Sequence, residues 1–354
     1  MESAFTIIAG RPRCPERSAI SSAVLDLPLA VGPAISTARA FSIRSSKSRM
    51  SHVLSLIAPA KKAPLAASDI DRARQALNAT GASAGSPEWL AAEEACEIHF
   101  EGGRNPALAA VRSAFRGRPV DINALPAEFR RKRMLVADMD STLIEQECID
   151  ELAAEIGVGE RVAAITERAM RGEIAFEPAL RERVGLLKGL AVEVAVKVLA
   201  ERIVIMPGAA VLVATMRAAG AYTALVSGGF TIFAGPISER LGFDEHRANL
   251  LQSEAGAFTG LVAEPILGGG AKEAALLDLT ARLHLDPAET LGVGDGANDL
   301  AMIRLAGLGV AYRAKPALRA AAAGIVDHAD LTGLLYLQGF RRDEFVINAA
   351  PAAR

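Results

Sequence analysis

The feature that most constrains the fold is an alternation of short apolar runs and helical patterns from residue 133 onward. Four apolar runs have the length and composition of buried strands. They are Met134–Ala137, Tyr222–Val226, Thr290–Val293 and Leu308–Ala311. Strands that alternate with helices across short turns are typical of a parallel sheet with helices on both faces. The sequence therefore predicts an α/β protein with a doubly wound, Rossmann-like parallel-sheet core over residues 134–340.

One interval interrupts this alternation directly after the first strand. Residues 144–205 contain helical periodicity but no strand pattern, as in Cys148–Ile156, Arg161–Arg171 and Glu193–Arg202. A helical insertion is the simplest arrangement that leaves the parallel sheet intact. We therefore expect a small helical cap at about 144–205, and a C-terminal tail at 341–354.

The region before the sheet is predicted to form a small α+β module over residues 50–125. The expected strands and helices are the strands 52–58, 95–100 and 118–124 and the helices 68–79 and 106–116. The segment 126–133 ends in a run of four basic residues, which is typical of a linker.

Residues 1–49 are rich in Ser, Ala and Arg and show no core-forming pattern. Arginines before a weakly apolar run resemble a signal or transit peptide, but Asp26, Pro28 and Pro33 interrupt that run. We expect a disordered extension upstream of a true initiator at Met50, because a strand pattern starts at His52.

Composition and charge exclude several classes of partner. The 354 residues carry a formal net charge of −2 and a pI near 6.3, which gives no basic field for nucleic acid or an anionic membrane. No apolar, uncharged stretch reaches the roughly 18 residues of a membrane span. The three cysteines lie outside any metal-binding or disulfide spacing, which favours a reducing, cytoplasmic setting.

The first core strand leads directly into two acids, Asp138 and Asp140. Open α/β sheets bind ligands at the carboxyl ends of their strands. Two carboxylates at such a place need a compensating cation, and their oxygens suit Mg²⁺. Taken alone, an aspartate pair is equally compatible with a turn or a helix cap.

A second acidic loop follows the strand at 290–293 and contains Asp295 and Asp299 between glycines. In a parallel sheet this loop lies at the same edge as Asp138, so the two acids can supply further oxygens to the metal or its waters. The glycines also resemble a dinucleotide loop, but Asp295 would repel a pyrophosphate.

Two further positions can hold phosphate oxygens. Ser227 and Gly228 follow the strand 222–226, where a hydroxyl and backbone N–H groups near a helix start can bind phosphate. Lys272 opens a helix after three glycines, yet it is not a Walker A lysine because no Ser or Thr follows it. Taken alone, each position is compatible with an ordinary turn or an exposed surface residue. The prediction of a phosphate site therefore depends on their order along the chain.

Together these positions form four motifs: Asp138-x-Asp140-x-Thr142, Ser227, Lys272 and Asp295-x-x-x-Asp299. Their order resembles that of the haloacid dehalogenase-like phosphohydrolases, over about residues 130–340. The resemblance implies that Asp138 is a nucleophile that forms an aspartyl phosphate, and that Asp140 is the general acid and base. It also implies that Asp138, the Asp140 carbonyl and Asp295 hold Mg²⁺. Ser227 and Lys272 would then neutralise the phosphate oxygens.

Within the insertion the resemblance narrows to the phosphoserine phosphatases of this family. It implies that Glu147 pairs with the ammonium of the substrate and Arg183 with its carboxylate. Phe176 would shield the site from water, and Asn298 would position the phosphate or a nearby loop. The implied reaction is the hydrolysis of O-phosphoserine to serine and phosphate, the last step of serine biosynthesis.

Several alternatives stay open at this point. The same mechanism could act on phosphothreonine, phosphohomoserine or a phosphorylated polyol, with Glu147 and Arg183 as ordinary charges on helix surfaces. The scaffold could also be a non-catalytic amino-acid sensor, although a sensor does not need the second aspartate, Asp140. The module at 50–125 faintly resembles amino-acid-binding regulatory domains, and a structural or dimerising role, hence a homodimer, fits it equally well.

Overall fold

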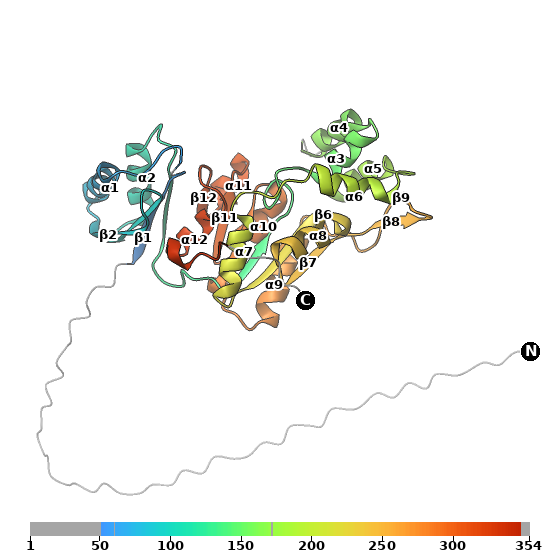
Figure 1. Cartoon of the computed structure of the whole chain (residues 1–354). Coiled ribbons are helices and arrows are strands. Elements are labelled where there is room, and N and C mark those ends of the chain that lie inside the picture. The colour runs from blue at the N-terminus through green and yellow to red at the C-terminus, as the bar shows by residue number, and fades with distance from the viewer. Residues whose placement is uncertain (1–50, 60, 171–172, 348–354) are drawn as a thin grey trace, which may run out of the picture. The chain divides into compact units, whose positions relative to one another are not determined.

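The computed structural model of the chain describes residues 51–59, 61–170 and 173–347 (Figure 1). The expected extension at 1–49 and residues 348–354 of the expected tail lie outside the described residues. Within the described ranges, no helix is both long and apolar enough to cross a membrane.

The module that precedes the core is an antiparallel four-stranded sheet with the order β2-β3-β1-β4 and two helices. Its elements are β1 His52–Ile57, α1 Ala67–Ala79, β2 Ser83–Ala91, β3 Ala95–Glu101, α2 Arg104–Ala114 and β4 Asp121–Pro126. The predicted strands and helices of this region are confirmed, but β2 is an additional strand. Because β2 is an exposed edge strand that contains Gly85 and Pro87, its sequence carries little strand signal.

The core is a six-stranded parallel sheet with the order β12-β11-β10-β5-β6-β7. Its strands are β5 Met134–Ala137, β6 Tyr222–Phe230, β7 Glu245–Asn249, β10 Thr290–Gly294, β11 Leu308–Tyr312 and β12 Gly324–Val326. The four predicted strands are confirmed. The two outermost strands, β7 and β12, were not predicted, because β7 is largely polar and β12 has only three residues.

Helices cover both faces of this sheet. They are α7 Ala209–Ala218, α8 Thr231–Leu241, α9 Ala271–Arg282, α10 Leu300–Leu305, α11 Pro316–Ala321 and α12 Gly333–Leu337. The side chains of β5 show which helices cover which face, because alternate side chains of a strand point to opposite faces of the sheet. Met134 and Val136 pack with residues of α9, α10 and α11, whereas Leu135 and Ala137 pack with residues of α7, α8 and α12.

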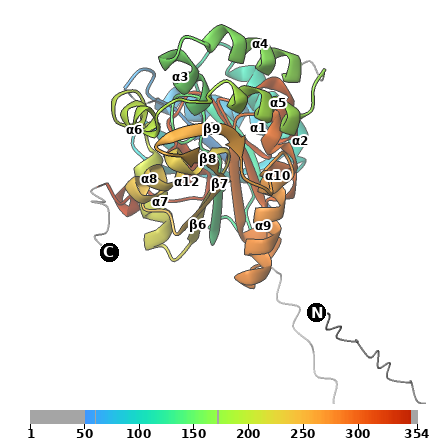
Figure 2. The same cartoon turned by 90° about the vertical axis from the view of Figure 1, so that its right-hand side faces the viewer.

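A cap built mainly of helices follows β5 (Figure 2). It consists of α3 Cys148–Glu155, α4 Gly159–Met170, α5 Phe176–Gly185 and α6 Val192–Glu201. A hairpin that was not predicted, β8 Leu251–Glu254 and β9 Ala257–Val262, joins the cap from a distant part of the sequence. The Phe258 N–H donates to the Leu190 carbonyl, and the Gly189 N–H donates to the Phe258 carbonyl, each over 2.8 Å.

Polar side chains of β4 cover the edge of the core sheet. The amide of Asn123, which is fully buried, donates to the Ile325 carbonyl over 2.9 Å and accepts from the Ile325 N–H over 2.8 Å. The Asp121 carboxylate accepts from the backbone N–H groups of Asp327 and Ala329. These bonds satisfy the open edge of β12, so the module and the core share a polar junction.

Candidate active site

Asp138 lies directly beyond the carboxyl end of β5, at the centre of the sheet. Its N–H donates to the Val293 carbonyl of β10 over 3.0 Å, which extends the parallel pairing by one residue. The residue is only 4% exposed, and its Oδ1 accepts from the Met139 N–H over 2.8 Å. Because burial and the nearby Asp299 oppose ionisation, the pKa of Asp138 is raised well above its ordinary value.

Lys272, in the first turn of α9, is the cation that faces this carboxylate. Its Nζ lies 2.6 Å from Asp138 Oδ2 and 2.5 Å from Asp299 Oδ1. The residue is 3% exposed, unlike most lysines that open a helix. Burial by itself lowers the pKa of this amine, but Asp138 and Asp299 together raise it. Lys272 is therefore a buried ammonium held between two carboxylates.

Three carboxylates form a group that fits a divalent cation. The oxygens of Asp138, Asp295 and Asp299 all lie within 4.8 Å of one another. Burial and then the charge of Asp299 raise the pKa of Asp295, which is the mark of acids crowded together without sufficient positive charge. A hard cation with oxygen ligands would relieve this repulsion, so the donor set fits Mg²⁺ or a similar ion.

The side chain of Asp140 points away from that group. Its Oδ1 accepts from the Cys148 N–H over 2.9 Å, and its Oδ2 accepts from the Ser227 hydroxyl over 3.3 Å. Burial raises the pKa of Asp140 despite these two donors. The two aspartates after β5 thus lie in different surroundings, Asp138 against a lysine and Asp140 against neutral donors.

The sequence predicted that Ser227 and Gly228 follow a strand that ends at Val226. In the structure both residues lie inside β6, which continues to Phe230. The pairing of β6 with β7 shifts register between Val226 and Phe230, so the intervening residues are outside the regular ladder. The Gly229 N–H donates to Ser227 Oγ over 2.8 Å. A Cβ at Gly229 would lie 2.8 Å from Asp140 Oδ2, which explains why a glycine is needed at this place.

The two charged cap residues predicted for the site are Glu147 and Arg183, and the acid Asp150 of α3 lies in the same lining. Glu147 accepts from the Ser141 hydroxyl over 2.8 Å, and burial together with Asp140 raises its pKa to about 7. Arg183, in the last turn of α5, donates from Nε to the Ala179 carbonyl over 3.3 Å and from Nη1 to Thr166 Oγ1 over 3.4 Å. Both contacts of Arg183 are long and go to uncharged acceptors.

A single cavity of about 260 Å³ brings these side chains together. Predicted residues that line it are Asp138, Asp140, Glu147, Phe176, Arg183, Ser227, Gly228, Asp295 and Asn298. Lys272 lies behind Asp138 rather than in the lining. The Phe176 ring covers one side, 3.2 Å from where a Cβ at Gly228 would lie.

Several residues of the lining were not singled out from the sequence. They include Cys148, Asp150, Thr166, Gly229, Gly296 and Lys315. Cys148 and Asp150 lie one and three residues after Glu147 in the sequence, so their proximity to Glu147 could have been predicted. Thr166 and Lys315 come from separate elements, α4 and the start of α11. Only the tertiary structure brings these two to the cavity.

Comparison with known proteins agrees with this architecture. The profile of the haloacid dehalogenase-like hydrolases matches residues 135–304. A phosphoserine phosphatase of Albidiferax ferrireducens is 46% identical over 219 residues, which cover 60% of this chain and 92% of that protein. One of Archaeoglobus fulgidus is 46% identical over 205 residues, which cover 58% of this chain but only 59% of the relative.

A solved structure extends the similarity to the module. The unliganded crystal structure of a probable phosphoserine phosphatase from Vibrio cholerae superposes with a TM-score of 0.69 and 32% identity. The match covers 84% of this chain and 88% of that one. The fold and the acidic site at the carboxyl edge of the sheet thus define a hydrolase of the haloacid dehalogenase-like class. Within that class, the chain belongs to the phosphoserine phosphatase family.

Proposed function

We propose that the protein hydrolyses O-phosphoserine to serine and inorganic phosphate. The observation that carries this proposal is the pairing of charges in the cavity. Glu147 and Arg183 come from the cap and are opposite in charge to the ammonium and the carboxylate of an amino acid. Asp138 and Asp140 lie below them on the sheet, where the phosphate would sit. A phosphorylated polyol would need neither of the two cap charges.

Asp138 is proposed as the nucleophile. One of its carboxylate oxygens forms a bond to phosphorus while the bond from phosphorus to the serine oxygen breaks, which leaves an aspartyl phosphate. Lys272, 2.6 Å from Asp138 Oδ2, holds the carboxylate in place and offsets negative charge beside the transferring group. Ser227 and the nearby backbone N–H groups are positioned to donate to the phosphate oxygens.

Asp140 is proposed to move the proton in both halves of the reaction. Burial favours its protonated form, so it can give a proton to the departing serine oxygen. The resulting carboxylate then takes a proton from water, whose oxygen attacks phosphorus and releases Asp138 and phosphate. The Cys148 N–H fixes the carboxyl group for this role, whereas the Ser227 hydroxyl, which donates to Asp140 in the structure, would turn to the phosphate when substrate binds.

The acids of the site are proposed to hold Mg²⁺ through Asp138, Asp295 and the carbonyl of Asp140. When bound, the ion neutralises the carboxylates and polarises the phosphate oxygens. Asp299 lies in the same group of oxygens, but its Oδ1 contacts Lys272 and its Oδ2 accepts from the Gly296 N–H. We therefore assign Asp299 mainly to orienting Lys272 and the loop.

Phe176 and Asn298 are given supporting roles. The ring of Phe176 lies between the cap and Gly228, where it can exclude water from the reacting groups. Asn298 lines the cavity beside Asp295 and can position the phosphate or this loop. A substrate of this kind places the enzyme at the last step of serine biosynthesis. The buried free thiols of Cys96 and Cys148 suit the reducing cytoplasm.

Phosphate release from a panel of phosphomonoesters, with and without Mg²⁺, tests the proposal. We expect phosphoserine to be the best substrate, with activity lost in EDTA and restored by Mg²⁺. The variant Asp138→Asn should be folded but inactive, and rapid quenching of the parent should trap phosphate on a peptide that contains Asp138. Trapping on another residue would refute the mechanism, and binding of phosphoserine without turnover would favour the sensor.

A further inference from the structure

A second cavity, away from the active site, lies where the module, the linker and the core meet. We call it the junction cavity, and its volume is about 260 Å³. Its lining is Arg104, Leu125, Pro126, Glu128, Phe129, Arg130, Lys132, Ala288, Gly307, Leu308, Ala323 and Leu337. None of these residues lines the active-site cavity, and the proposed reaction uses none of them.

Lys132 is the unusual residue of this lining. It is only 8% exposed, yet within the described part of the chain its ammonium has a single hydrogen bond, to the Ala288 carbonyl over 2.6 Å. Among the described residues, no carboxylate lies within 4.0 Å of it. An ammonium has three donors, and a buried charge without a partner is costly. Glu289 attracts this charge without contacting it and Arg130 repels it, so Lys132 offers donors that lack an acceptor at the wall of the cavity.

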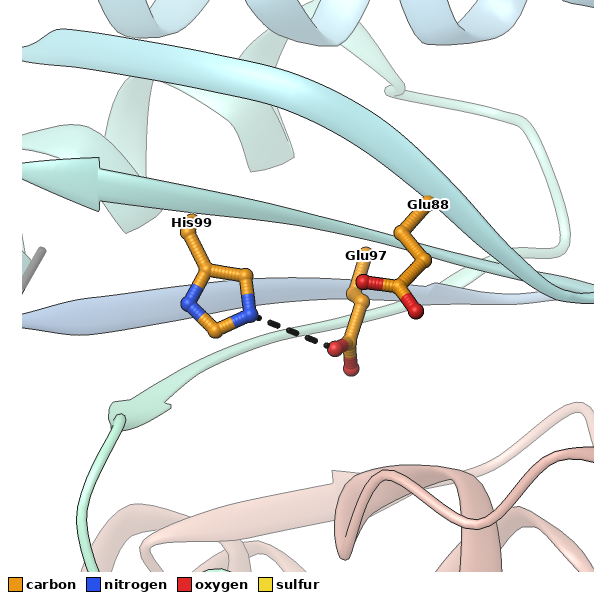
Figure 3. A group of neighbouring side chains, drawn as sticks. All are labelled: Glu88, Glu97 and His99. Carbon is orange, nitrogen blue, oxygen red and sulfur yellow. Dashed lines mark ion pairs between the residues drawn. The ribbon is translucent and has the colours of Figure 1, made fainter.

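The nearby buried carboxylate, Glu97, is already engaged. It accepts from Arg130 Nη1 over 2.7 Å and lies 3.4 Å from His99, as Figure 3 shows for the histidine. Glu88, on the neighbouring strand in Figure 3, pairs with Arg341. Glu97 is thus engaged by Arg130, and Glu88 by Arg341, so neither carboxylate is an ion-pair partner of Lys132.

Arg130 has a further unmet donor. Its Nη2 donates to the carbonyls of Tyr336 and Leu337, but its Nε is buried and has no acceptor among the described residues. Two cationic side chains of the lining, Arg130 and Lys132, thus have donors without partners. The lining as a whole carries three basic side chains, those of Arg104, Arg130 and Lys132, and one acidic side chain, that of Glu128.

The remaining wall is apolar and includes a strained aromatic residue. Leu125, Leu308 and Leu337 are buried. Phe129 is 55% exposed and has a backbone φ of +52°, a region that a bulky residue rarely occupies. A ring so exposed contributes little to core packing and is available to contact a molecule in the cavity.

We propose that the junction cavity binds a small organic monoanion with an apolar body, whose carboxylate contacts Lys132 while its body packs between Phe129 and the leucines. Burial lowers the pKa of the Lys132 amine to about 8, so without a bound anion the charged form of the amine is less favoured than it is in water. A carboxylate would supply the missing acceptor and favour the charged amine. Because module and core both line the cavity, the ligand would also strengthen their junction.

Calorimetric titration of the full chain with phenylacetate tests the proposal. We expect one molecule bound per chain, and at least tenfold weaker binding of both phenylacetamide, which lacks the charge, and acetate, which lacks the apolar body. The substitution Lys132→Met keeps the apolar stem of the side chain but removes the ammonium. It should weaken phenylacetate binding about tenfold or more, because that is the change in Kd expected when a hydrogen bond to a charged group is lost. Lys61→Met removes an exposed lysine of the same module and should leave binding unchanged.

A second variant keeps the test decisive if Lys132→Met is poorly folded. Phe129→Gly removes the ring and relieves the backbone strain, so it should fold and should bind phenylacetate at least tenfold more weakly. Its kcat/KM for phosphoserine should equal that of the parent. Equal binding by the parent and Phe129→Gly, no binding by the parent, or competition between phenylacetate and phosphoserine would overturn the proposal.

Discussion

The contacts of Arg183 allow the cost of removing it to be worked out. A guanidinium has five N–H donors. Among contacts with the described residues two are used, on the Ala179 carbonyl and on Thr166 Oγ1, and both bonds are long. The other donors remain for a substrate carboxylate, with which they can form a bidentate pair. Hydrogen bonds to charged groups contribute about 1.5–3 kcal/mol each. Arg183→Ala should therefore lower kcat/KM for phosphoserine by roughly ten- to a hundredfold or more.

The assay compares substrates that differ in the carboxylate. Phosphoethanolamine keeps the phosphate and the ammonium but has nothing for Arg183 to hold. It should be a poor substrate for the parent, and Arg183→Ala should scarcely change its kcat/KM. Arg181→Ala is the matched control, because Arg181 lies on the same helix but pairs with Glu264 at the surface. This control should behave like the parent with both substrates.

Equal losses for phosphoserine and phosphoethanolamine in Arg183→Ala would refute this assignment. Arg183 would then support the cap or the phosphate through its contact with Thr166, instead of recognising an amino acid. A phosphorylated polyol or another phosphomonoester would become the leading substrate.

Three further predictions follow from the electrostatics and the hydrogen bonds. Glu147, with a pKa of about 7, is neutral below that pH and charged above it, so kcat/KM for phosphoserine should rise from pH 6 to 8. The rise should be smaller in Glu147→Gln and with 3-phosphoglycerate, which lacks the ammonium, because only the ionisation of the substrate phosphate, with a pKa of about 6, is then left to contribute; a pH profile unchanged by Glu147→Gln would contradict the assignment. Asn123→Ala leaves the N–H and the carbonyl of Ile325 unpaired and should lower the free energy of unfolding in urea by about 2–3 kcal/mol, whereas the exposed Asn78→Ala should have little effect. Mg²⁺ at about 100 times its Kd should stabilise the protein by about 2.7 kcal/mol, seen as a higher melting temperature, and Asp295→Asn should reduce this shift.

The parts of the fold that the sequence predicts are those with strong local patterns. Strand β5 is four buried residues in a row, and its predicted bounds agree with the structure. Strands β2, β7 and β12 lie at the edges of their sheets, where side chains are more often polar or the pairing is short. The hairpin β8–β9 joins the cap through backbone bonds to residues 189 and 190, and no local pattern encodes that contact.

The candidate site likewise combines features that the sequence predicts with contacts that it does not predict. Acids at strand ends are visible in the sequence because parallel strands bring their carboxyl ends to one edge. The pairing of Lys272 with both Asp138 and Asp299 depends on the rotation of α9 against the sheet, and the contact of Thr166 with Arg183 depends on how α4 packs on α5. Such contacts arise only when helices pack, so residue order alone could not predict them.

If the site binds the proposed metal, its charge implies that metal and substrate bind cooperatively. Five acidic and two basic side chains line the cavity, and a phosphate adds further negative charge. Lys272 cannot compensate alone, because its ammonium is already shared by Asp138 and Asp299. A divalent cation must therefore raise the affinity for phosphate, and by linkage phosphate must raise the affinity for the cation by the same factor. Lowering Mg²⁺ should consequently raise KM for phosphoserine as well as lower kcat. A KM independent of Mg²⁺ would mean that the carboxylates are protonated when substrate binds, as their raised pKa values allow.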